Sequence, residues 1–129
     1  MRMSADGSVK ASQMISKSNG GFTAELRALD MFGVSMAAIG DLDGDNVTEL
    51  AVGAWGDDEG GGNAGAVYVL FLRPTGMVRT FHKIPHARAN LYDSWGTGIA
   101  ALGDADDDGV PDMAVGGGYA DPNKAGNLD

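Results

Sequence analysis

Cysteine is absent from this 129-residue chain, and aromatic residues make up only 7% of it. The chain therefore has no disulfide, no thiolate zinc site and no cysteine nucleophile. No apolar run approaches the roughly 18–20 residues that a transmembrane helix needs, so we expect no membrane insertion. The first ten residues also lack the apolar segment of a signal peptide. Either the protein stays inside the cell, or this chain does not begin where its gene product begins.

Basic residues are scarce: 9 lysines and arginines stand against 18 acidic residues, which gives a formal net charge of −9. This balance argues against nucleic acid as a partner and against docking on anionic membranes. It suits cations. No Ser/His/Asp set and no isolated carboxylate pair indicates catalysis, so we do not expect an enzyme. The length fits one small domain, and the 21 glycines predict many turns rather than long helices.

The central part of the chain contains an internal repeat. "GVSMAAIGDLDGDNVTELAVG" (33–53) aligns without gaps on "GTGIAALGDADDDGVPDMAVG" (96–116), and eleven of the 21 positions are identical. A weaker similarity joins "GSVKASQMIS" (7–16) to "GMVRTFHKIP" (76–85). Agreement of this kind is the signature of a repeated structural unit.

The repeated unit reads as four short strands, because apolar and β-branched runs alternate with turn residues. The expected strands cover residues 34–40, 48–54, 65–72 and 77–84. In the last of these, strict alternation would place Val78 and Ile84 on one face and Arg79 and Phe81 on the other. We interpret the segment before the repeat, "FTAELRALDMF", as loop. Four-stranded units repeated along a chain predict an all-β fold of β-propeller blades, here an incomplete propeller.

Two acidic loops stand at the same place in the two copies, between the first and second strands. Ca²⁺ requires six to eight oxygen ligands, which carboxylates at alternate loop positions and one backbone carbonyl supply. Positions 1, 3, 5 and 9 carry carboxylates, and position 7 offers its carbonyl. Position 6 must turn sharply, which Asn and Gly tolerate. The ligand set predicted for two Ca²⁺ sites is Asp41, Asp43, Asp45, Val47 and Glu49 in the first loop, and Asp104, Asp106, Asp108, Val110 and Asp112 in the second.

Other interpretations of these loops are less favoured. An EF-hand needs Glu at position 12, where this chain has Val52 and Val115. Mg²⁺ is disfavoured because it prefers to keep its waters. A turn rich in Asp and Gly that binds no metal stays open as an alternative. The loop "GDDEGGGNAG" (56–65) could hold a further cation, but a solvated connection between strands is the favoured interpretation.

These motifs resemble FG-GAP repeats, the blades of the integrin alpha-chain β-propeller and of many bacterial extracellular proteins. Phe32-Gly33 supplies the "FG", and Gly53-Ala54 begins the "GAP", with Trp55 in place of proline. The resemblance implies structural Ca²⁺ loops. It also implies a secreted or cell-surface location, where calcium is millimolar.

The phase of the repeat divides the chain into five parts. We expect residues 1–16 to be the end of a preceding blade, 17–32 a loop, 33–84 a complete blade, 85–93 a linker and 94–129 the first half of a following blade. A propeller has about four to eight blades. The chain is therefore expected to be part of a longer protein.

The function predicted from these features is a non-catalytic, calcium-stabilised module for extracellular interaction or adhesion. Its ligand, protein or glycan, is not identified by the sequence. The alternative is an accessory propeller region of a secreted enzyme, such as a phospholipase or a glycan-acting hydrolase. Self-association through exposed blade edges is a further expectation, because unpaired strands invite pairing.

Overall fold

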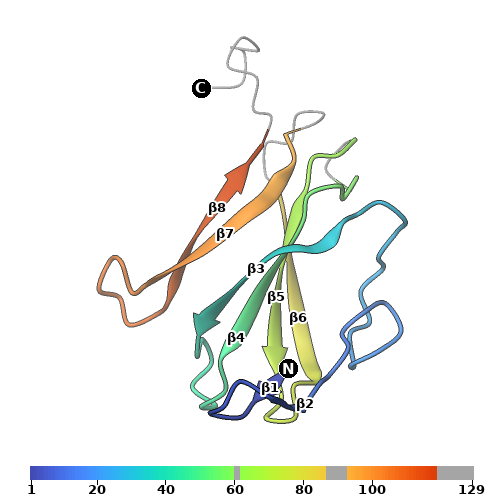
Figure 1. Cartoon of the computed structure of the whole chain (residues 1–129). Helices are drawn as coiled ribbons and strands as arrows, with labels where there is room; N and C mark the ends of the chain where they lie inside the picture. The colour runs from blue at the N-terminus through green and yellow to red at the C-terminus, as the bar shows by residue number, and fades with distance from the viewer. Residues whose placement is uncertain (60–61, 87–92, 119–129) are drawn as a thin grey trace.

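The computed structural model describes residues 1–59, 62–86 and 93–118, and every regular element among them is a β-strand (Figure 1). No helix in these residues is long and apolar enough to cross a membrane. The strands are β1 (Arg2–Met3), β2 (Val9–Ala11), β3 (Phe32–Gly40), β4 (Glu49–Ala54), β5 (Ala66–Leu72), β6 (Val78–Pro85), β7 (Trp95–Gly103) and β8 (Asp112–Gly117). The predicted all-β fold is confirmed.

The centre of the molecule is an antiparallel sheet in the order β3-β4-β5-β6. Neighbours in the chain are neighbours in the sheet, so the unit is a simple up-and-down blade. Its four strands fall where the alternating apolar runs predicted them. Two further pairs, β1-β2 and β7-β8, form separate two-stranded sheets. The five-part division of the chain stays a prediction.

One face of the blade is covered by the segment that the sequence had suggested was only a loop. Phe22 is 2% exposed and stacks on Phe32 with ring centroids 4.9 Å apart. It also meets Tyr68 and Phe81 edge-on. The segment has no regular secondary structure there, but it fills the core of that face. Its apolar residues follow no strand or helix period, which is why this role was missed.

The opposite face of the blade packs against the β7-β8 pair, of which β7 is the strand that lies beside β3 and β4 (Figure 1). Buried Val67 and Val69 meet Ile99 and Val115 there, and the half-buried Trp95 joins the same cluster. Trp95 therefore packs between the sheets. A Cβ on Gly53 would lie 2.0 Å from the Gly96 carbonyl oxygen, so this close approach requires glycine.

The strand β6 departs from the alternation expected of it. Phe71 pairs with Thr80, but Leu72 pairs with Val78, so Arg79 is an extra residue without a partner on β5. This β-bulge changes the face that follows it. Val78 consequently packs with Phe81 in the core on the Phe22 side, and Ile84 packs on the other face. The expectation that Val78 and Ile84 share a face was wrong for this reason.

Candidate metal centre

The two acidic loops occupy equivalent places, one between β3 and β4 and the other between β7 and β8. A register shift precedes each loop, at Gly40 in one sheet and Gly103 in the other. Both glycines have positive φ, 94° and 68°. The bulge bends the strand into the loop and pairs that glycine with position 9, Glu49 or Asp112.

Each loop brings three aspartates together. Oxygen atoms of Asp41, Asp43 and Asp45 lie within 4.8 Å of one another, and so do those of Asp104, Asp106 and Asp108. Two oxygens that bind one Ca²⁺ at about 2.4 Å can be at most about 4.8 Å apart. The structure therefore brings together six of the ten predicted ligand residues, in two groups of three.

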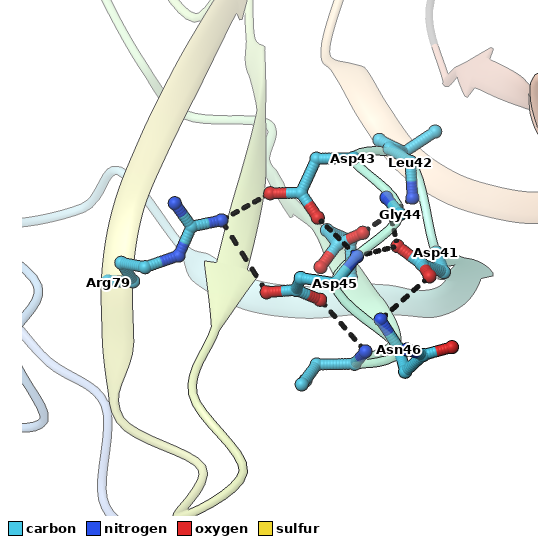
Figure 2. Close-up of polar contacts among 9 residues, drawn as sticks. Asp41, Leu42, Asp43, Gly44, Asp45, Asn46 and Arg79 are labelled. Atoms are coloured by element: carbon cyan, nitrogen blue, oxygen red, sulfur yellow. Dashed lines mark hydrogen bonds and ion pairs between the residues drawn. The ribbon is translucent and has the colours of Figure 1, made fainter.

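Backbone N–H groups hold the first loop in shape, as Figure 2 shows. Asp41 accepts hydrogen bonds from Gly44 (2.7 Å), Asp45 (3.1 Å) and Asn46 (2.9 Å). These bonds hold the pKa of Asp41 below its ordinary value, that from Asn46 having the largest effect. Asp43 Oδ1 and Asp45 Oδ1 also accept backbone bonds, which leaves their Oδ2 atoms facing outward from the backbone.

The second loop repeats this pattern. Asp104 accepts hydrogen bonds from Asp108 (3.0 Å) and Gly109 (2.8 Å). Asp106 and Asp108 accept bonds through Oδ1 from residues two positions further on. The repeated sequence thus forms the same local structure on two different sheets.

Positive φ angles make both loops tight. Position 6 has φ of 62° at Asn46 and 88° at Gly109, which confirms the sharp turn expected there. Position 4 has the same property, 78° at Gly44 and 61° at Asp107, and the sequence argument missed it. Asn, Asp and Gly adopt this conformation at least cost.

Glu49 is fully buried, with 0% exposure, although its side chain is acidic. Its Oε2 accepts a 2.6 Å hydrogen bond from the Leu42 N–H, while its Oε1 is buried without a hydrogen-bond partner. Burial raises the pKa of Glu49; the Leu42 bond opposes this, and the three aspartates of the loop raise it further. An unpaired carboxylate oxygen beside three carboxylates is costly unless a cation balances it.

The other four predicted ligands do not belong to the two groups of three aspartates. Asp112 is half-buried and accepts a 2.8 Å bond from the Ala105 N–H, which mirrors the bond between Glu49 and Leu42. Neither position-9 carboxylate belongs to its group of three aspartates. Val47 and Val110 use their N–H groups within the loops. Ligation by their carbonyls stays a prediction.

The donor set fits a hard divalent cation. All side-chain donors are carboxylate oxygens, which suit Ca²⁺ and not a soft transition metal. The unpartnered Oε1 of Glu49 is an independent indication, because it needs a positive partner that no described residue provides. A bound Ca²⁺ would be held by the three aspartates of each loop and would supply charge neutralisation, which fastens two strands together.

A second polar cluster lies in the loop between β4 and β5, where the sequence had favoured a solvated connection. Asp57 is 3% exposed, whereas Asp58 and Glu59 are exposed, so the described part of the loop is only partly solvated. Residues 60 and 61 of this loop lie outside the described residues. Lys83 contacts Asp57 at 2.8 Å and also Glu59, and the Tyr68 hydroxyl donates to Asp57 at 3.2 Å. These groups line a cavity of about 410 Å³. Only the aromatic and lysine positions on β5 and β6 could have indicated this pairing.

The blade and its acidic loop define an all-β repeat of the propeller type. Residues 32–70 match the FG-GAP repeat family, so the chain carries an FG-GAP repeat. Integrin alpha-M of Mus musculus is 31% identical over 88 residues, which are 66% of this chain. The chain spans only 7% of the length of that integrin.

Proposed function

We propose that this chain is a calcium-binding FG-GAP module in which both acidic loops hold Ca²⁺ for structural purposes. The observation that carries the proposal is the buried, unpartnered Oε1 of Glu49, whose carboxylate lies near enough to the three aspartates of the first loop for their charges to act on it. The matching group of three aspartates in the second loop, with four equivalent hydrogen bonds, extends it to a second ion. Calcium would fasten β3 to β4 and β7 to β8 where each pair separates.

The wider role that we propose is non-catalytic interaction at the cell surface or outside the cell. Likeness to an integrin alpha chain supports this location. Calcium there is millimolar, which suits sites with few protein ligands and open geometry. The net charge of −9 favours cations and disfavours nucleic acid. The ligand of the module would be a protein or a glycan.

Free sheet edges offer a further contact that we propose for this module. Among the described residues β6 pairs only with β5, and β8 only with β7. Strands of a longer chain, or of a second copy, would complete these sheets. Sedimentation of the isolated chain measures its mass, and a strictly monomeric chain at high concentration would argue against self-association.

Calorimetric titration with Ca²⁺ tests the metal sites after the chain has been stripped with chelator. We expect two sites in the wild-type chain. Asp43→Asn should remove one and Asp106→Asn the other, because each deletes a carboxylate from one group of three. Glu25→Gln is the matched control, since Glu25 is an exposed carboxylate that pairs only with Lys17. A folded chain that takes up no calcium at millimolar concentration would overturn the proposal.

A further inference from the structure

Arg79 is directed to the first acidic loop by the β-bulge in β6. It is the extra residue between the pairs Phe71–Thr80 and Leu72–Val78. Bulges redirect a side chain relative to the regular alternation of the strand. The guanidinium lies 5.9 Å from the centre of the Phe71 ring, a cation–π contact that restricts its position.

The guanidinium contacts the two carboxylate oxygens that the loop backbone leaves free. Arg79 Nη2 pairs with Asp43 Oδ2 and lies 3.7 Å from Asp45 Oδ2 (Figure 2). The Oδ1 atoms of these aspartates are already occupied by backbone N–H groups. A divalent cation in this loop would compete for the same two Oδ2 atoms, because they accept no backbone hydrogen bond, whereas each Oδ1 already accepts one.

Among the described residues, no positively charged side chain pairs with the second loop. None of the ion pairs between described residues involves Asp104, Asp106 or Asp108. Four of its backbone hydrogen bonds match those of the first loop, which has one more, from Gly44 to Asp41. The positive partner of the first loop therefore comes from the neighbouring strand β6 and not from the repeated loop.

We propose that Arg79 is an internal competitor for the cation of the first loop and sets its affinity. In the metal-free chain the guanidinium balances Asp43 and Asp45. Before Ca²⁺ binds it must release both, and it also repels the ion by Coulomb's law. This inference rests on the proposed calcium binding and concerns the first loop alone.

Calcium titration of three variants in an Asp106→Asn background tests this competition, because that background silences the second loop. We expect Arg79→Gln to raise the affinity of the first loop about tenfold, and Arg79→Lys to change it less than about threefold. Arg73→Gln is the matched control for the loss of one positive charge, since Arg73 makes none of the ion pairs between described residues. It should leave the affinity within about twofold.

The outcomes separate the two proposals. Unchanged or weaker binding in Arg79→Gln would overturn the competition and leave calcium binding intact. No binding at the first loop, with Arg79 or without it, would overturn calcium binding there as well. If Arg79→Gln fails to fold, the wild-type chain still decides: the Arg79 Nε–Hε NMR signal should shift in proportion to saturation of the first loop. A signal that stays constant through saturation would overturn the competition.

Discussion

The two acidic loops have the same backbone structure but different surroundings. The first loop stands on a four-stranded sheet with a filled core on both faces, and its position-9 carboxylate is fully buried. The second stands on a two-stranded sheet, and its aspartates are exposed. Arg79 balances part of the charge of the first loop, and no described residue does so for the second.

This difference shows which properties belong to the repeat and which to its context. Loop shape is local, because side-chain oxygens bond to N–H groups two to five residues away. Electrostatic balance is not local, because Arg79 lies 36 residues from Asp43 in the chain. Two copies of one motif can therefore have equal geometry and unequal affinity for the same ion.

The largest effect on stability should come from disrupting the aromatic core of the blade that carries the first loop. Phe22→Ala deletes a ring that packs on three other aromatic rings, and we expect a loss of about 3–5 kcal/mol in the free energy of unfolding. Urea denaturation measures this loss. Leu29→Ala is the control, since Leu29 is 80% exposed and should change stability by less than about 0.5 kcal/mol. A Phe22 variant as stable as the control would show that the segment does not support the blade.

A smaller change in the free energy of unfolding should appear only at alkaline pH, and it should come from Tyr68 in the blade that carries the first loop. Burial raises the pKa of Tyr68 to about 12, and the nearby charge of Asp57 acts in the same direction. The stability that depends on neutral Tyr68 is complete below about pH 10 and is lost as the pH rises towards 12, because the unfolded chain ionises first. Tyr68→Phe should remove this alkaline loss. Denaturation at about pH 9 and about pH 11 checks the slope, and equal slopes in both chains would contradict the assignment.

The smallest effect on stability should come from exchanging the residues at position 6 of the two loops, Asn46 and Gly109. Asn46→Gly should stabilise the first loop, and Gly109→Asn should destabilise the second, each by up to about 1 kcal/mol, because glycine adopts positive φ at lower cost. Chelator-treated samples in urea isolate this backbone effect from metal binding. Changes of the same sign in both variants would contradict the equivalence of the two loops.

The sequence predicted most of the blade and the form of the acidic loops. Repeat identity, the positions of the strands and the turn residues Asn46 and Gly109 are local signals, and the structure confirms each. Phe22 was missed because it lies in an irregular segment, where periodicity gives no information. Arg79 was missed because a bulge is not encoded by alternation, and strict alternation placed Val78 on the wrong face.

The burial of Asp57 was missed as well, because it depends on pairing with Lys83 and Tyr68 across the sheet. Non-local pairs require the register of strands, which the chain order alone does not fix. The same limit applies to the contact between Trp95 and the face of the blade.

Equilibrium dialysis of the stripped wild-type chain against millimolar Ca²⁺ tests the central claim most directly, with circular dichroism to verify that the chain is folded. Two calcium ions bound per chain is the expected result, one for each group of three aspartates. A folded chain that retains no calcium would contradict the account and would mean that both loops are only tight acidic turns.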